Sequence, residues 1–345
     1  MSLTAVHLIR LDGSHKLGLG HVYRIRELAS YLRQKNQESL FLVNDNISVL
    51  ELLQDFNLEV LTSEYTEDEV KKKMTSIINS RGIRTIISDL LFYPKSYINF
   101  LKTVNIPKVS FHEHVIEDNF SDVLVNYNTF KNSLSTLETN DPNCLGPKYC
   151  ILPRNLLNCK TISIKRQVKK VLITFGGSDP QNFTSKVIKL LDLHKNFFKN
   201  INEIMLHIGS ENIKKEEVKA LADRSSLKLN LVSEIKDFSS LMEESDLAIC
   251  SGGNTMYELC YLGIPSIVLP QNNHQRNFSS ELNKYGYLKI VNVNVSDFEN
   301  TFISTLLDLL NDYSLRKEYN QKSTNLFDGL GLDRISERII DIQNK

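Results

Sequence analysis

Short apolar runs alternate along the chain with stretches in which apolar residues recur every three or four positions. The runs predict buried strands, and the three-to-four spacing predicts helices that cover them. In the first half we expect strands at Val6 to Ile9, Ser39 to Val43, Thr85 to Ser88, Lys108 to Phe111 and Val123 to Asn126, and helices from His21, at Ile47 to Leu53 and at Ser96 to Val104. Strands that alternate with helices predict a parallel sheet covered on both faces, which is an α/β fold.

The second half repeats this alternation. We expect strands from Val171, at Ile204 to Ile208, at Leu229 to Val232, from Leu247 and at Ser266 to Pro270. Between the halves, residues 158–168 are polar and basic, and we interpret them as a linker. The expected organisation is a first domain at 1–157, the linker at 158–168, a second domain at 169–332, and a final helix at 333–345 that packs back on the first domain.

The stretch from Ala248 to Asn277 contains an apolar run, a glycine turn and a helix that ends at Gly263. Glycines let the backbone approach a ligand, and the first N–H groups of a helix form an anion site. The residues expected to bind a phosphate here are Ser251, Gly252, Gly253, Asn254 and Thr255. One turn later, the carboxylate of Glu258 can accept two hydrogen bonds from a ribose diol. The plainer alternative is a capped tight turn with Glu258 in solvent.

A second glycine turn follows the strand that begins at Val171. It consists of Gly176, Gly177 and Ser178, and a Ser/Asp/Asn-rich segment leads from it into the next helix. This turn resembles the Ser251 turn in design. We therefore expect it to add free backbone N–H groups to the same phosphate site.

His21 opens a helix after the turn-rich loop at residues 10–20. The helix dipole disfavours the protonated imidazole there, and a neutral imidazole beside a glycine loop suits a general base. Asp12 and Arg24 flank the loop, where they would orient the imidazole or bind a phosphate. Asp89 ends a predicted parallel strand and is expected at the same sheet edge. The alternative is that His21 only satisfies the helix start and that the charged residues lie on the surface.

Composition limits the classes of partner. Lys plus Arg equals Asp plus Glu at 41 each in 345 residues, which argues against nucleic acid or an anionic membrane. The five cysteines are odd in number and form no C-x-x-C pair, and the chain start lacks a basic, cleavable leader, so we expect a cytoplasmic protein with reduced thiols and no membrane span. We also expect a monomer. In the run from Phe111 to His114, two histidines separated by one residue point to opposite faces of a strand, so we favour a loop role over a metal site.

Five segments carry a resemblance to a known family: RLDGSHKLGLGHVYR, LGPKY, VLITFGGSDP, SGGNTMYELCYLGIP and HQRN. Together they resemble the UDP-sugar hydrolases of pseudaminic acid biosynthesis and their spore-coat polysaccharide relatives, over nearly the whole chain. That family is similar to the UDP-N-acetylglucosamine transferase of peptidoglycan synthesis. The resemblance implies a GT-B fold, in which two Rossmann-like domains face a cleft.

The resemblance also implies a reaction. It is a metal-independent, cofactor-free, inverting hydrolysis that releases UDP from a 2,4-diacetamido-2,4,6-trideoxy sugar, for nonulosonic acid or surface polysaccharide synthesis. His21 would deprotonate the attacking water. The other implied contacts are diphosphate on Gly177, Ser178, Gly253, Asn254 and Thr255, ribose on Glu258, and substrate on Asp12, Gly18, Gly20, Arg24, Asp89, Tyr93, His274, Gln275 and Asn277.

The sequence departs from the family at two positions. Tyr93 comes four residues after Asp89, where the pseudaminic hydrolases place a tyrosine two residues after the aspartate, and His274 replaces the usual asparagine before Gln275. Three functions therefore stay open. They are a UDP-sugar hydrolase, a glycosyltransferase of the same fold in which His21 activates an acceptor hydroxyl and His274 contacts the donor, and a non-catalytic nucleotide-sugar-binding module. The presence of His21 argues against the third.

Overall fold

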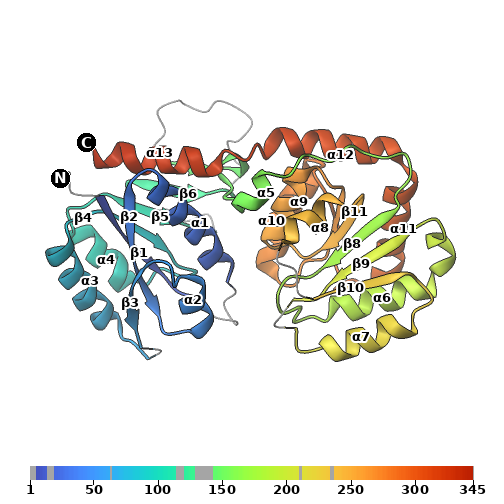
Figure 1. Cartoon of the computed structure of the whole chain (residues 1–345), viewed down its shortest axis with the longest axis horizontal. Helices are drawn as coiled ribbons and strands as arrows, with labels where there is room; N and C mark the ends of the chain where they lie inside the picture. The colour runs from blue at the N-terminus through green and yellow to red at the C-terminus, as the bar shows by residue number, and fades with distance from the viewer. Residues whose placement is uncertain are drawn as a thin grey trace. The chain divides into compact units, whose positions relative to one another are not determined.

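The chain forms two compact α/β units. The computed structural model describes residues 5–13, 19–62, 64–113, 120–128, 143–209, 212–233 and 237–344 (Figure 1). Unit 1 combines Met1–Pro153 with Gly329–Lys345, and unit 2 is Arg154–Asp328. Each unit contains a parallel sheet, and helices connect most of its successive strands, which confirms the predicted fold class.

Unit 1 contains a seven-stranded sheet in the order β3-β2-β1-β4-β5-β6-β7, and every pair of neighbours is parallel. Its strands are β1 (Ala5–Leu11), β2 (Gln37–Asn44), β3 (Asn57–Leu61), β4 (Ile83–Asp89), β5 (Lys108–Phe111), β6 (Val123–Asn126) and β7 (Cys144–Leu145). Its helices are α1 (Gly20–Gln34), α2 (Ile47–Leu52), α3 (Glu67–Arg81), α4 (Lys95–Thr103), the 3-10 helix η1 (Pro147–Tyr149) and α13 (Gly331–Gln343). The last helix returns to contact α1, η1, β4 and β6 (Figure 1).

Unit 2 contains a six-stranded parallel sheet in the order β10-β9-β8-β11-β12-β13. Its strands are β8 (Lys170–Thr174), β9 (Glu203–His207), β10 (Leu229–Val232), β11 (Leu247–Cys250), β12 (Ser266–Val268) and β13 (Lys289–Ile290). Its helices are α5 (Arg154–Leu157), α6 (Phe183–Leu193), the 3-10 helix η2 (Lys195–Phe198), α7 (Lys215–Arg224), α8 (Phe238–Glu243), α9 (Asn254–Leu262), α10 (Asn273–Lys284), α11 (Phe298–Asn311) and α12 (Tyr313–Leu326).

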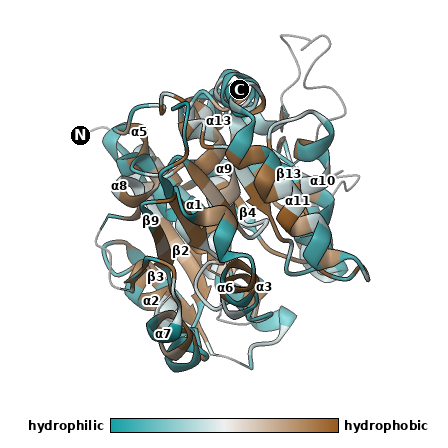
Figure 2. Cartoon of the chain, turned by 90° about the vertical axis from the view of Figure 1, so that its right-hand side faces the viewer, coloured by the Kyte–Doolittle hydropathy of each residue, from teal (hydrophilic) through white to brown (hydrophobic). Residues whose placement is uncertain are grey.

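The hydrophobic pattern explains the sheets. All four residues of β11 are buried, as expected for a central parallel strand that helices cover on both faces. Figure 2 shows β2 and β9 coloured as hydrophobic strands, and the buried side chains of each sheet pack against its helices. Gly263 ends α9 with φ 72°, the left-handed conformation that the sequence predicted. Among the helices of the described segments, none combines the length and apolar character of a membrane span.

Strand order places the predicted site residues. In unit 1 the chain moves outward in opposite directions from β1 and β4, so their carboxyl ends form the switch point at which parallel α/β sheets bind ligands. His21 follows β1, and Asp89 is the last residue of β4. In unit 2 the corresponding neighbours are β8 and β11. Both predicted glycine turns directly follow these two strands.

Candidate functional site

His21 lies in the first turn of α1, and its buried imidazole contacts the end of β4. Its Nδ1 atom is 2.8 Å from Oδ1 of Asp89. Arg24, one turn later on the same helix face, donates from Nε to Oδ2 at 2.6 Å and from Nη2 to Oδ1 at 2.5 Å. The helix therefore presents a base and a cation to one fully buried carboxylate.

The charge of Asp89 bears on which nitrogen of the His21 imidazole carries the proton. Burial alone would raise the pKa of this carboxyl group, but the attraction of Arg24 and then of His21 outweighs burial and lowers the pKa below its usual value. Nδ1 lies 2.8 Å from Oδ1 of the anionic Asp89 and 2.9 Å from the donor Nη2 of Arg24; the shorter contact is to the carboxylate, so in a neutral imidazole we assign the proton to Nδ1. The Nε2 atom then carries the lone pair that a general base needs.

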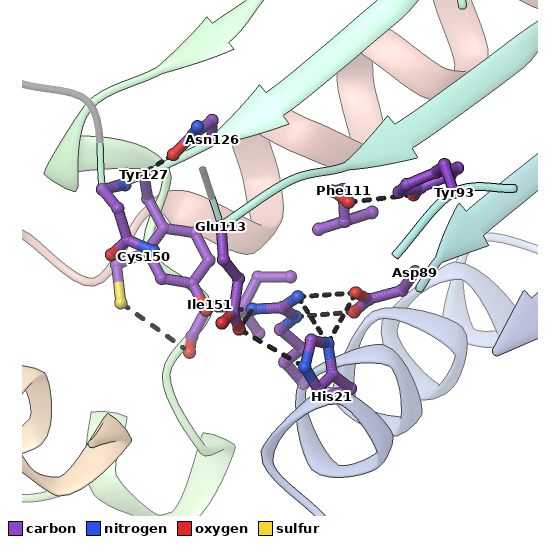
Figure 3. A network of polar contacts seen from close by, with 11 residues as sticks. His21, Asp89, Tyr93, Phe111, Glu113, Asn126, Tyr127, Cys150 and Ile151 are labelled. Atoms are coloured by element: carbon purple, nitrogen blue, oxygen red, sulfur yellow. Dashed lines mark hydrogen bonds and ion pairs between the residues drawn. The ribbon is translucent and has the colours of Figure 1, made fainter. Parts of the chain in front are cut away.

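Glu113 lies on the other side of the imidazole (Figure 3). Its Oε1 atom accepts from Arg24 Nη1 at 2.9 Å and lies 3.5 Å from His21 Nε2. Arg24 Nη1 also donates to the hydroxyl of Tyr127 at 2.7 Å. The sequence interpretation missed Glu113, because it treated residues 111–114 as a question about metal ligands. The available signal was that Glu113 comes two residues after the predicted strand that ends at Phe111. The structure shows that Phe111 pairs with Asp89, so Glu113 lies at the same sheet edge.

The other predicted residues of unit 1 have different surroundings. Asp12 accepts from Arg10 at 2.6 and 2.8 Å and from the Tyr65 hydroxyl at 2.7 Å, so Asp89, not Asp12, orients His21. Gly20 is the first residue of α1. Gly18 and His114 lie outside the described residues.

Tyr93 is buried beneath the site. Its hydroxyl donates to the carbonyl oxygens of Ser88 at 2.7 Å and Phe111 at 2.9 Å, and thereby joins the ends of β4 and β5. Burial raises its pKa well above the usual value. The His112 ring stacks on Tyr93 with centroids 4.6 Å apart. Within the described part of the chain, no group of three or more His, Cys, Asp or Glu side chains is arranged to hold a metal ion.

The first glycine turn of unit 2 does not lead directly into a free helix start. Gly176 has φ 78° and Asp179 has φ 42°, and α6 begins only at Phe183. The Asp179 carboxylate accepts from the backbone N–H groups of Phe183 and Thr184, both at 2.9 Å. The predicted free N–H groups at this helix start are thus occupied. A phosphate at this position would therefore contact the turn itself, which is formed by Gly176, Gly177 and Ser178.

The second glycine turn leads directly into a helix start. Gly253 is the N-cap of α9 and no side chain caps this helix, so its first N–H groups remain free of side-chain acceptors in the described chain. Asn254 and Thr255 are the first two residues of α9, and Ser251 is buried next to Gly252. An uncapped helix start with a positive dipole end is an anion site.

Gln275 joins two strand ends. Its Oε1 atom accepts from the backbone N–H groups of Gly252 at 3.1 Å and Gln271 at 2.9 Å. These residues follow β11 and β12. The bonds fix the amide so that Nε2, the donor, faces the Gly253 turn. In the same helix, the His274 ring contacts Phe278 edge-on at 4.3 Å, and Asn277 is exposed.

Glu258 lies one turn into α9 with its side chain partly exposed. Among the described residues, none forms a hydrogen bond or ion pair with its carboxylate, and burial raises its pKa to about 7. A carboxylate without compensating donors is costly to charge, and a ligand that brings two hydroxyl groups would lower that cost.

Comparisons with known proteins support the fold. The Glycosyltransferase family 28 C-terminal domain matches residues 171–335. The structure of Acinetobacter baumannii MurG aligns with a TM-score of 0.73 at 14% identity, over 97% of this chain and 99% of that one. The chain therefore has a GT-B, glycosyltransferase-like fold.

Three curated relatives are similar in sequence. The uncharacterized protein MJ1062 of Methanocaldococcus jannaschii is 31% identical over 77% of this chain, which spans only 55% of that protein. The spore coat polysaccharide biosynthesis protein SpsG of Bacillus subtilis is 25% identical over 96% of both chains. A Helicobacter pylori protein described as pseudaminic acid cytidylyltransferase and UDP-2,4-diacetamido-2,4,6-trideoxy-beta-L-altropyranose hydrolase is 34% identical over 40% of this chain and 24% of its own length.

Proposed function

We propose that this protein is a glycosyltransferase that transfers a sugar from a UDP-sugar donor to a hydroxyl acceptor in polysaccharide biosynthesis. The proposal is carried by one observation, inside the segment that matches family 28. An uncapped helix start at α9 is followed one turn later by the carboxylate of Glu258, which has no hydrogen-bond or ion-pair partner among the described residues. This order suits a diphosphate followed by a ribose. The resemblance of the sequence motifs to those of UDP-sugar hydrolases supports uridine as the base.

The proposed step is a single displacement. The acceptor oxygen forms a bond to the anomeric carbon while the bond from that carbon to the diphosphate breaks, and its electron pair stays on UDP. The acceptor proton passes to His21 Nε2, and Asp89 stabilises the imidazolium through Nδ1. The N–H groups at the start of α9 stabilise the negative charge that develops on the leaving diphosphate. Attack opposite the leaving group inverts the anomeric configuration.

The first experiment incubates the purified chain with a panel of UDP-sugars, beginning with UDP-N-acetylglucosamine, with and without a mixture of sugar acceptors. UDP release and new glycosides are followed by NMR and mass spectrometry. We expect acceptor-dependent glycoside formation. UDP binding without turnover on any donor and acceptor would contradict the proposal, and so would a requirement for another nucleotide.

Hydrolysis is the second candidate, supported by the similarity to the H. pylori protein and by the shared motifs. In this case water replaces the acceptor hydroxyl, and the other roles stay the same. UDP release from a UDP-2,4-diacetamido-2,4,6-trideoxyhexose that is as fast without acceptor as with acceptor would establish hydrolysis in place of transfer.

A further inference from the structure

Glu113 is a carboxylate held beside the nitrogen that acts as base. Its Oε1 atom is 3.5 Å from His21 Nε2, which is longer than a direct hydrogen bond. Arg24 nevertheless fixes this oxygen by donating to it at 2.9 Å. Figure 3 shows Asp89 and Glu113 on opposite sides of the imidazole. Asp89 contacts Nδ1 and Glu113 lies beside Nε2, so the two carboxylates face different nitrogens of the ring.

Because Nε2 and Oε1 are 3.5 Å apart, one oxygen can be within hydrogen-bond distance of both atoms from the side. An oxygen about 2.8 Å from both atoms can donate its proton to Nε2. Glu113, paired with the Arg24 guanidinium, is then a carboxylate that only accepts hydrogen bonds. An isolated alcohol has already donated its single proton to Nε2, and its lone pairs would face the negative oxygen of Glu113. A second O–H group, on the attacking oxygen or next to it, donates to Glu113 and replaces this repulsion with a hydrogen bond.

We propose that Glu113 is a positioning residue that selects acceptors with a second O–H group on, or next to, the attacking oxygen. The acceptor is therefore a vicinal diol, as in sugars, or water, which carries both O–H bonds on one oxygen. The inference rests on the proposed function, because it takes His21 as the base. In the reaction, the proton of the attacking hydroxyl moves to Nε2. The second hydroxyl keeps its proton and its hydrogen bond to Glu113.

The test uses competition between two small probes. The full chain is incubated with UDP-N-acetylglucosamine, or with the donor that the panel identifies, in equal concentrations of ethane-1,2-diol and ethanol. The ratio of the two glycosides is measured by mass spectrometry. A charge-assisted hydrogen bond predicts a preference for the diol of at least about tenfold in the wild type. Glu113→Ala should reduce the ratio to its statistical value, and Glu113→Gln, which keeps a weaker acceptor, should give an intermediate ratio.

The ratio is internal to each variant, so a merely lower activity does not change it. Glu299→Ala, an exposed glutamate on α11, is the matched control and should keep the wild-type ratio. Free sugar formed in the same tubes reports water as the nucleophile. An unchanged ratio in Glu113→Ala, or no diol preference in the wild type, would overturn the role of Glu113 while leaving the proposed function intact. Absence of UDP release by the wild type from every donor would instead contradict the proposed function.

Discussion

Asp89 in unit 1 and Glu258 in unit 2 are carboxylates on which burial acts in the same direction but with opposite net results. Asp89 accepts hydrogen bonds from Arg24 and His21, and its pKa is lowered despite its complete burial. Glu258 has no such donors among the described residues, and its pKa is raised to about 7. The difference lies in the partners that the chain itself supplies.

This contrast separates chemistry from binding. In unit 1 the base, its orienting carboxylate and the cation are already in contact, so little reorganisation is needed when an acceptor arrives. In unit 2, the start of α9 has no side-chain cap and Glu258 has no partner within the described segments, and a nucleotide can supply both. Under the proposed function, unit 1 carries out proton transfer and unit 2 binds the nucleotide.

The largest expected effect comes from removing the base. His21→Ala should reduce turnover by about 10³-fold, because general base catalysis contributes roughly this much. His194→Ala, at the end of α6, is the control histidine and should retain wild-type turnover. Initial rates of UDP release measure both. Wild-type rates in His21→Ala would show that unit 1 does not supply the base.

Asp89→Asn tests whether unit 1 is held together by its charges. The variant leaves Arg24 buried without its principal counter-charge, and we expect the free energy of unfolding to fall by about 3 kcal/mol at pH 7. Because the pKa of Asp89 is lowered, its contribution is present at neutral pH and is lost as the pH falls through that pKa, below the usual 3.8. Urea unfolding at pH 7 and pH 3 measures the difference. Equal urea midpoints for the wild type and Asp89→Asn at pH 7 would show that the Asp89 charge does not stabilise unit 1, and its contrast with Glu258 would not hold.

Glu258→Gln should have the opposite effect on stability. A raised pKa means that the folded protein holds the proton more tightly, so stability is lost as the pH rises from 4.5 towards 7. Glutamine avoids this loss, and we expect the variant to be more stable than the wild type by about 2 kcal/mol at pH 8, with the gain disappearing near pH 5. Thermal unfolding at both values measures it. Glu299→Gln, at an exposed position of α11, is the control variant.

Gln275 tests phosphate binding in unit 2, and we expect a smaller effect on UDP affinity. Gln275→Ala removes the acceptor for the N–H groups of Gly252 and Gln271, so the glycine turn loses its support. UDP affinity should fall about fivefold, as for the loss of ordinary hydrogen bonds. Gln275→Glu keeps the acceptor but adds a negative charge, so it should weaken UDP more than uridine. Equal loss for both ligands would argue against a phosphate beside Gln275.

The sequence predicted the parallel sheets because their strands are buried on both faces, and β11 is the simplest example. It did not reveal β3 or α3. Only one of the five β3 residues is fully buried, and α3 is highly charged with only Val70, Met74 and Ile77 buried. The capping box formed by Thr66 and Glu69 was the local signal for α3 that the interpretation did not use.

The candidate site was predictable only in part. His21 and Glu258 follow from motifs at helix starts, but side-chain partners come from strands distant in sequence. Asp89 is 68 residues from His21, and Glu113 is 89 residues from Arg24. Spacing therefore suggested Asp12 as an orienting residue, whereas the order of β1 and β4 selects Asp89. Likewise, the capping of α6 by Asp179 depends on a left-handed turn that the glycine pattern does not encode.

The division between the two units is tested most directly by calorimetric titration of UDP into the wild type, His21→Ala and Glu258→Gln. The account predicts equal UDP affinity for the wild type and His21→Ala. It predicts a loss of about tenfold or more for Glu258→Gln, because the ribose hydroxyls lose a charged acceptor. If His21→Ala weakened UDP as much as Glu258→Gln, or if Glu258→Gln bound UDP as well as the wild type, the assignment of nucleotide binding to unit 2 and catalysis to unit 1 would be contradicted.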